Sequence, residues 1–477
     1  MMIATPLGTG RARGTRSLLV RRRGIVLWPL LVAVLVTGPS TLTAAEPAWR
    51  AGAAKVTITP EKPMWMSGYA SRNHPAEGTL IDLWAKALVL EDAAGQRVAV
   101  LTLDLVGIDR EFSLAVRKLI EARTGLPAAR VAICCSHTHT GPVVGENLGA
   151  MYFLEEDQAQ LARDYTAALP EKLAAVVASA VEDLRPARVN WTEGTADFAV
   201  NRRNNREPEV PRLREQGALV GPVDHRVPVL AVTRADTGAL HAVLFGYACH
   251  ATTLSFYQWS GDYPGFAMQK LEEAHPGATA LFFAGCGADQ NPLPRQTVEL
   301  ARGYGERLAA AVEAALAGES KPARGPLAVE YQEIDLPLGT LPTRDELTSQ
   351  ASSSDRYQAS RAKRLLAQLD AGNPLAATYP YPVQTWRLDP DLVFVTLGGE
   401  VVVDYSLRLK AELAPSTAWI AGYSNDVMAY IPSRRVLHEG GYEGAGAMVY
   451  YGLPCPWAPE VEELIVGTVK DEVEKTK

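Results

Sequence analysis

The chain of 477 residues has few cysteines, and their arrangement excludes two common roles. There are five, so at least one has no partner within the chain, and their spacing forms neither a disulfide framework nor a C-x-x-C zinc site. Most of them lie in or beside apolar, strand-like runs, where a cysteine is often a small buried hydrophobic residue. These are Cys134, Cys135, Cys249 and Cys286. One disulfide stays open as an alternative, because export would permit it.

The N-terminal apolar run is too short for a membrane-spanning helix, which needs ~20 apolar residues. Residues 25–36 form this run, Pro29 interrupts it, arginines precede it and small residues at 43–45 follow it. That order is typical of a secretory signal peptide. We therefore predict that residues 1–45 are a signal peptide and that the protein is secreted or periplasmic. An uncleaved anchor is the alternative.

Beyond this segment the sequence has no strongly basic patch. Residues 1–45 carry six arginines and no acidic residue, so the formal charge of -7 for the whole chain becomes about -13 for the remainder. Phosphate contacts need clustered lysine and arginine, so nucleic acid is excluded as a partner. The remaining ~430 residues are enough to bury a large core.

Strand-like and helix-like segments alternate through the rest of the chain, which predicts an α/β fold with a mixed β-sheet core flanked by helices. Strands are predicted at 86–90, 98–103, 131–135, 185–191, 229–233, 241–248, 280–283, 392–397 and 418–421. Helices are predicted at 111–123, 158–184 (with Pro170 a kink or break), 265–274, 298–316, 343–369, 401–413 and 460–474. The polar stretch 201–223 is predicted as a surface loop, and 318–325 as a hinge.

The most informative motif is Ser-His-Thr-His-Thr-Gly-Pro at 136–142, directly after the apolar run 131–135. Side chains at i and i+2 of an extended segment point to the same face, so His137 and His139 can reach one centre. Neutral imidazole is the commonest nitrogen ligand of zinc, and a second ring nearby can act on a substrate. A pair of ordinary histidines at a strand end is the alternative for this motif taken alone.

Two further apolar runs end in residues that can bind a metal. His250 follows the run 245–249, and Glu400 follows 393–397 after two glycines. A metal site at the ends of several strands is therefore predicted, although His250 alone could be structural and Glu400 could complement a helix dipole. Asp262 could cap a helix or orient a ligand histidine.

Taken together, these segments resemble the neutral (non-lysosomal) ceramidase family, whose members are zinc-dependent amidases that cut ceramide into a fatty acid and sphingosine. The resemblance includes the His-Thr-His motif, the Gly-Glu pair at 399–400 and two tyrosines, Tyr430 and Tyr442, in a glycine-rich stretch. By position it implies a catalytic domain over 46–477. It also implies Zn²⁺ with four protein ligands, namely His137, His250, Glu400 and Tyr430. His139 and Tyr442 would face the substrate amide, and Arg202 would reach the active site, with a solvated loop charge as the alternative for Arg202.

The sequence departs from the family at two places. The family has Gly-Asp-Val-Ser-Pro-Asn after the central strand, with a serine required for ceramide cleavage, and alignment on Gly287 puts Gln290 at that serine. Gln290 is no nucleophile, but its amide can bind substrate. The family's C-terminal immunoglobulin-like domain is also predicted to be absent.

The predicted function is that of an exported zinc-dependent hydrolase that cleaves the amide bond of ceramide or another N-acyl lipid-like substrate through a metal-activated water. Contact with a membrane stays open, but after signal removal no integral membrane segment is predicted. Three alternatives remain. The same fold could act on a smaller amide, ester or lactone, or the protein could be a zinc-containing binding module without turnover. The third is an exported sugar-binding or structural protein with coincidental histidines.

Overall fold

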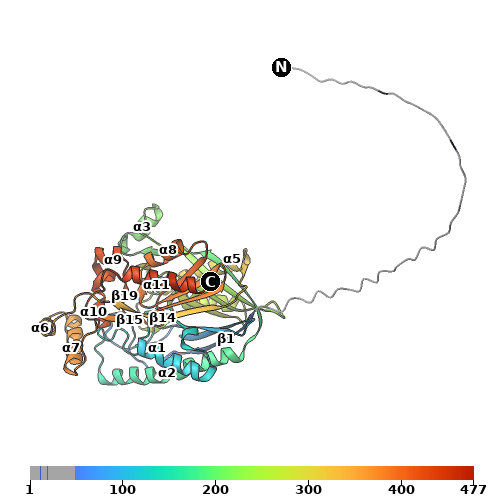
Figure 1. Ribbon diagram of the computed structural model, residues 1–477. Helices are drawn as coiled ribbons and strands as arrows, with labels where there is room; N and C mark the ends of the chain where they lie inside the picture. Colours follow the sequence, from blue (N-terminus) through green and yellow to red (C-terminus); the bar gives the residue numbers. More distant parts are fainter. Residues whose placement is uncertain (1–10, 12–18, 20–48) are drawn as a thin grey trace, which may run out of the picture. The chain divides into compact units, whose positions relative to one another are not determined.

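Two β-sheets packed face to face form the centre of the computed structural model, which describes residues 11, 19 and 49–477 (Figure 1). The predicted signal peptide, 1–45, therefore lies outside the described residues except at two positions. Residues 49–477 belong to one compact unit. The predicted α/β class, with a mixed sheet flanked by helices, is confirmed.

The larger sheet is mixed and has the order β11-β9-β8-β6-β1-β3-β4-β5, with β13 paired to β6. Its strands are β1 (Trp49–Thr57), β3 (Trp84–Asp92), β4 (Arg97–Leu103), β5 (Val131–Cys135), β6 (Arg185–Thr195), β8 (Arg226–Arg234), β9 (Leu240–Tyr247), β11 (Thr279–Ala284) and β13 (Lys321–Pro322). The outermost pairs, β4 with β5 and β9 with β11, are parallel, whereas the strands between them pair antiparallel.

Each face of this sheet contributes to a different hydrophobic core, because successive side chains of a strand alternate between faces. In β3, Ala87 and Val89 pack toward the helices, whereas Leu88 and Leu90 pack toward the second sheet. The helices on the outer face are α1 (Arg110–Thr124), α2 (Glu156–Glu182), α4 (Asp262–Ala274) and α5 (Val298–Ala317). Figure 1 shows α1 and α2 on the side away from α8 and α11.

The second sheet has the order β14-β15-β16-β18 and covers the inner face of the first. Its strands are β14 (Ala328–Pro337), β15 (Thr378–Asp389), β16 (Leu392–Leu397) and β18 (Thr417–Ala421), and α8 (Val403–Glu412) and α11 (Val461–Lys475) lie over its outer face. Aromatic side chains join the sheets. The ring centroids of Phe283 and Phe394 are 5.2 Å apart, and those of Trp191 and Trp419 are 6.3 Å apart.

Every predicted strand is present, but three strands of five or more residues, β1, β14 and β15, were not predicted from the sequence, and neither were the strands of two or three residues. In β15, Pro380 and Pro382 argue against a central strand, because proline has no N–H to donate to a neighbour. Both prolines lie in the part of β15 that pairs only with β14, since pairing with β16 begins at Val383. All five cysteines are buried and unpaired, so the disulfide left open above is absent.

The helix predictions need two corrections. The single helix predicted at 343–369 is two, α6 (Arg344–Gln350) and α7 (Arg356–Asp370), because the Asp355 carboxylate accepts from the N–H groups of Tyr357 and Gln358 and starts a new helix. The helix predicted from residue 401 begins later, because residues 400 and 401 form a strand. The other predicted helices are confirmed, and α2 continues through Pro170.

The stretch 201–223, predicted as a loop, begins at the end of a short strand and contains a short helix. The predicted hinge at 318–325 contains β13, which pairs with β6, and the Gly325 N–H donates to the Leu388 carbonyl. The remaining short elements are β2 (Gly78–Thr79), β7 (Ala199–Asn201), α3 (Val210–Glu215), β10 (Gln258–Trp259), β12 (Gln290–Pro292), β17 (Glu400–Val401), β19 (Tyr430–Ile431), α9 (Arg434–Glu439) and α10 (Met448–Tyr451). No helix among the described residues has an apolar stretch long enough to span a bilayer.

The two edges of the larger sheet approach each other, because β11 contacts β3, β4 and β5 across the sheet. The last residue of β18 and the segment that follows it pair with both edges. Ala421 pairs with Gly285, just after β11, and Ser424 pairs with Cys134 of β5. The polar segments that follow β5, β9, β16 and β18 are thereby brought to one place.

Candidate metal centre and its cavity

His137 and His250 are held by backbone carbonyls that decide which ring nitrogen carries the proton. Nδ1 of His137 donates to the Val106 carbonyl at 2.5 Å, and Nδ1 of His250 donates to the Gly287 carbonyl at 2.8 Å. A carbonyl only accepts, so in each neutral ring Nε2 is left with a lone pair. Both side chains are 1% exposed, and burial together with the Arg202 guanidinium lowers the pKa of His250 to about 4. The ring of His250 is therefore uncharged at neutral pH.

Glu400 and Tyr430 are brought together by a two-residue parallel ladder between β17 and β19, in which they are direct partners. Paired residues of neighbouring strands project to the same side, so both side chains point toward the histidines. Gly399 makes this possible. Its φ is +74°, and a Cβ there would lie 2.7 Å from the Ala429 carbonyl oxygen.

The four predicted ligands converge on one point. Glu400 Oε2 lies 3.1 Å from Nε2 of both His137 and His250, and the Tyr430 hydroxyl lies 3.3 Å from Nε2 of His250. Glu400 Oε2 is buried and has no hydrogen-bond donor among the described residues. Two imidazole lone pairs and a carboxylate thus face one another with no proton between them. A cation bound among them would offset their mutual repulsion. This donor set therefore fits a divalent metal.

His139 lies beside this group and lines the cavity above it. Its Nε2 is 3.1 Å from Nε2 of His137, and its Nδ1 is buried without a partner among the described residues. The rings of His137, His139 and His250 are close enough to hold one metal ion between them. The geometry thus allows two ligand sets, one with His139 and one with Glu400 and Tyr430 in its place.

Gly68 lies directly against the His139 ring and leaves room for it. Its φ is +96°, and a Cβ at this residue would lie 2.5 Å from Nδ1 of His139. Arg72 donates to the His139 carbonyl at 2.7 Å, which fixes the backbone. Any side chain at position 68 would displace the imidazole.

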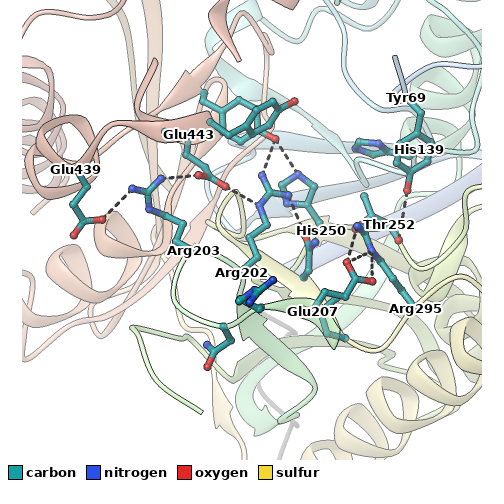
Figure 2. Close-up of a pocket in the computed structure, with 18 of the residues that line it drawn as sticks. Tyr69, His139, Arg202, Arg203, Glu207, His250, Thr252, Arg295, Glu439 and Glu443 are labelled. Atoms are coloured by element: carbon teal, nitrogen blue, oxygen red, sulfur yellow. Dashed lines mark hydrogen bonds and ion pairs between the residues drawn. The ribbon is translucent and has the colours of Figure 1, made fainter. Parts of the chain in front are cut away.

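We call the four predicted metal ligands, His137, His250, Glu400 and Tyr430, the metal group. Arg202 connects this group to the outer wall of the cavity (Figure 2). Its guanidinium donates to the Tyr430 hydroxyl at 3.1 Å, to Asn291 Oδ1 at 3.1 Å and to Glu443 at 2.7 Å. Burial raises the pKa of Tyr430, and the Arg202 charge opposes that rise. Arg202 is therefore part of the site, and the alternative of a solvated loop charge is wrong.

Tyr442 begins a π-helical turn over residues 442–446, and its ring centroid is 5.3 Å from that of Tyr430. It lines a cavity of about 640 Å³, a volume typical of small-molecule sites. His139, His250, Tyr430 and Arg202 line the same cavity. All the predicted site residues except Gln290 meet at this cavity or directly beneath it.

The structure contradicts the prediction that the Gln290 side chain binds substrate. Gln290 is fully buried, its Nε2 donates to the Ala248 carbonyl, and its Oε1 accepts from the Asp224 N–H. Both ends of its amide are used by backbone, and the residue does not line the cavity. The next residue, Asn291, does line it, because successive side chains of β12 point to opposite sides.

Sequence reasoning also missed Tyr451, whose hydroxyl donates to Glu400 Oε1 and so orients the carboxylate. Its only signal in the sequence was the tyrosine-rich stretch in which it lies. Asp262 is the first residue of α4, and its carboxylate accepts from the N–H of Tyr263, in the first turn of that helix, and from the N–H of Leu254. It therefore stabilises the start of the helix, and it binds no histidine among the described residues.

The comparison with protein families agrees with this geometry. Residues 49–328 match the family described as neutral/alkaline non-lysosomal ceramidase, N-terminal. The chain belongs to this family. Among curated neutral ceramidases, that of Oryza sativa subsp. japonica is 24% identical over 277 residues, 57% of this chain and 33% of that protein. Neutral ceramidase 1 of Arabidopsis thaliana is 25% identical over 299 residues, 61% of this chain and 38% of that protein. The match thus spans 33% and 38% of the length of these two ceramidases.

Two solved ceramidase structures share the fold. The neutral ceramidase from Pseudomonas aeruginosa aligns with a TM-score of 0.68 at 21% identity, over 90% of this chain and 74% of that one. A ceramidase complexed with C2 aligns with a TM-score of 0.67 at 19% identity, over 89% of this chain and 76% of that one.

The burial of Gln290 changes how this chain is aligned with the neutral ceramidases. Their Asp-Val-Ser-Pro matches Asp-Gln-Asn-Pro at 289–292 if the aspartate and the proline are kept in register. Asn291 then stands opposite the family serine, in agreement with its place on the cavity wall. The alignment on Gly287 differs from this one by one residue, because this chain has Ala288 between the glycine and the aspartate.

Tyr451→Phe should weaken metal binding about 10- to 100-fold, because Glu400 loses the donor that orients it. The affinity is measured by zinc titration against a competing chelator. Tyr450→Phe is the matched control, because the Tyr450 hydroxyl makes no hydrogen bond within the part of the chain that the structure describes. Equal affinities for both variants would show that Tyr451 does not support the site.

Gln290→Leu should mainly lower stability, whereas Asn291→Leu should mainly lower catalytic efficiency. The first leaves the Ala248 carbonyl and the Asp224 N–H without partners, and should lower the free energy of unfolding by about 1–3 kcal/mol while kcat changes little. The second should lower kcat/KM with a smaller loss of stability. Denaturant unfolding and steady-state kinetics separate the two, and a loss of turnover confined to Gln290→Leu would restore the first alignment.

Proposed function

We propose that the chain is a zinc-dependent hydrolase that cleaves the amide bond of ceramide or of another N-acyl lipid-like substrate. The observation that carries this proposal is the convergence of His137 and His250 Nε2, Glu400 Oε2 and the Tyr430 hydroxyl beneath a cavity, in a member of the neutral ceramidase family. Two nitrogens and two oxygens in a compact group suit zinc. We further propose that residues 46–477 are the catalytic domain.

Zinc held by these residues would polarise a substrate carbonyl and lower the pKa of water to about 7, which makes water a nucleophile at neutral pH. The protein side chains around it have separate tasks. His139 faces the cavity with Nε2 beside the metal group, so it can accept a proton from water and pass one to the leaving nitrogen. The Tyr442 hydroxyl can donate to the oxyanion, and Arg202 keeps the Tyr430 oxygen in place.

A second candidate function is hydrolysis of a different amide, ester or lactone, and Asn291 is the observation that favours it. Its Oδ1 accepts from Arg202, so its Nδ2 group is left to donate into the cavity. An amide cannot act as the nucleophile that a serine hydroxyl can be. A reaction that needs only a metal, a base and oxyanion donors is compatible with asparagine here. A zinc-containing binding module without turnover remains the alternative from another class.

We also propose that the protein acts outside the cytoplasm, as the predicted signal peptide at 1–45 implies. This proposal rests on the sequence alone, and direct N-terminal sequencing of the secreted or periplasmic protein tests it. A mature N-terminus near residue 46 would support it, whereas an intact N-terminus in the cytoplasmic fraction would overturn it.

The deciding test is product detection by mass spectrometry with zinc-loaded protein and ceramide. We expect release of fatty acid and sphingosine that stops when zinc is removed by a chelator and returns when zinc is restored. His137→Ala should lose both stoichiometric zinc and turnover, because His137 is a ligand in both sets that the geometry allows.

No product from ceramide, together with turnover of a smaller amide, ester or lactone, would favour the second candidate function. A zinc-loaded protein inert on the whole panel would favour the binding module. Full activity of His137→Ala would contradict the ligand assignment itself.

His139→Gln distinguishes the two ligand sets. If His137, His250, Glu400 and Tyr430 hold the metal, this variant keeps one zinc per chain, and kcat falls by about 100-fold or more through loss of the proton-transferring imidazole. Zinc content is measured by elemental analysis after dialysis, and kcat by amine release. Loss of zinc in His139→Gln would instead assign His139 to the metal.

A further inference from the structure

The outer wall of the cavity is charged rather than apolar. Of the described residues that line the cavity, only Leu293 has an aliphatic hydrocarbon side chain. The outer wall is formed by Arg202, Arg203, Arg206, Glu207, Arg295, Glu439 and Glu443. Small-molecule sites are usually lined mainly by apolar and aromatic groups. Here a neutral two-chain lipid would find the rings of Tyr69, Tyr430 and Tyr442 and one aliphatic side chain, whereas the outer wall is charged.

The glutamates of this wall are already bound by arginines. Glu443 accepts from Arg202 and from Arg203, at 2.7 Å each. Glu207 accepts from both Nε and Nη2 of Arg295, at distances of 2.9 to 3.1 Å (Figure 2). The carboxylates therefore have little capacity left to bind a cationic ligand.

Glu439 is shared in the same way. It accepts from Arg203 at 3.0 Å and from Arg435, an arginine outside the cavity, at 3.0 Å. Each acidic group of the wall thus has at least one guanidinium partner, and two of the three have two.

Arginine donors, in contrast, remain unused. Nη1 of Arg295 has no hydrogen-bond acceptor among the described residues, and Nε of Arg203 is buried without one. The side chain of Arg206 is 83% exposed, and its nearest carboxylate, that of Glu209, is 3.9 Å away. An arginine fork with free N–H groups matches a carboxylate or a similar oxyanion.

Two more arginines add positive charge close behind the wall. Arg214 donates to the carbonyls of Leu293 and Phe198, and Arg72 donates to those of His139 and Phe256. Within the described part of the chain neither forms an ion pair with a carboxylate. The charge of these guanidiniums is not compensated locally, so the cavity attracts anions.

We infer that the substrate of this site is an N-acyl amine that carries an anionic group, such as a carboxylate, and that Arg206 and Arg295 bind this group. The inference rests on the proposed amide hydrolase. In that reaction the C–N bond breaks, the oxygen of water bonds to the carbonyl carbon, and a proton from water passes to the nitrogen, so the products are an acid and an amine. The anionic group can lie on either product without changing this balance.

Three amides with the same twelve-carbon acyl chain test the inference on the zinc-loaded protein. N-dodecanoylglycine carries a carboxylate on the amine half, the ethanolamine monoamide of dodecanedioic acid carries one on the acyl half, and N-dodecanoylethanolamine is neutral. We expect kcat/KM for one of the two anionic amides to exceed that of the neutral amide by about 10- to 100-fold, the range of a charge-assisted hydrogen-bond pair. The preferred anionic amide identifies the half that faces the arginines.

Substitutions of the two arginines test whether they cause the preference for an anionic amide. Arg206→Gln and Arg295→Gln should each reduce the ratio of anionic to neutral kcat/KM, mainly through KM for the anionic amide. Arg212→Gln is the matched control, because Arg212 is an exposed arginine of the nearby α3 that does not line the cavity. This variant should keep the full ratio.

The possible failures are distinguishable. Equal or better turnover of the neutral amide, or a ratio that Arg206→Gln and Arg295→Gln leave unchanged, would overturn the inference and leave the amide hydrolase intact. Turnover of none of the three amides and none of ceramide would overturn the proposed function, and this inference with it.

Discussion

The site depends above all on backbone pairing of the segment after β18 with both edges of the larger sheet. The Tyr423 carbonyl accepts from the N–H of Cys135, at the end of β5, and the Tyr423 N–H donates to the carbonyl of Gly399. The N–H of Gly422 donates to the carbonyl of Ala284, at the end of β11. One short segment therefore joins the strand before His137, the strand before Asn291 and the turn before Glu400. Backbone hydrogen bonds hold it, and the Asn425 side chain adds one more link, because its Oδ1 accepts from the N–H of Ile133 in β5.

Orientation of the metal group follows the same principle. The carbonyls of Val106 and Gly287 select the ring nitrogens of His137 and His250 that face the centre, and the β17–β19 ladder aligns Glu400 with Tyr430. Side chains enter only at the next step, where Tyr451 orients Glu400 and Arg202 binds Tyr430. Residues held in this way would lose little conformational freedom on binding a metal ion.

The cavity combines two surfaces with different chemistry. Its floor is the metal group with His139 and Tyr442, which are the residues that the family resemblance implied. Its wall consists of paired glutamates and arginines with donors to spare, and these come from the segment 202–207, from Arg295 and from residues 439–443. Arg202 touches both surfaces, because it binds Tyr430 on one side and Glu443 on the other. Arg202 therefore couples the predicted metal ligands to the charged wall.

The sequence by itself determined the α/β class and most of the longer strands, and it indicated His137, His250 and Glu400 as candidate metal ligands, because apolar runs that end in histidine or glutamate are local patterns. Tyr430 was indicated only by the family resemblance. It could not show β15, where Pro380 and Pro382 disguise a strand that pairs on one side only, or the break before Asp355. Only the tertiary structure decided that Gln290 is buried, that Asn291 faces the cavity and that Tyr451 binds Glu400. The reason is physical, since these contacts join residues far apart in the chain, and their geometry exists only once the sheets are packed.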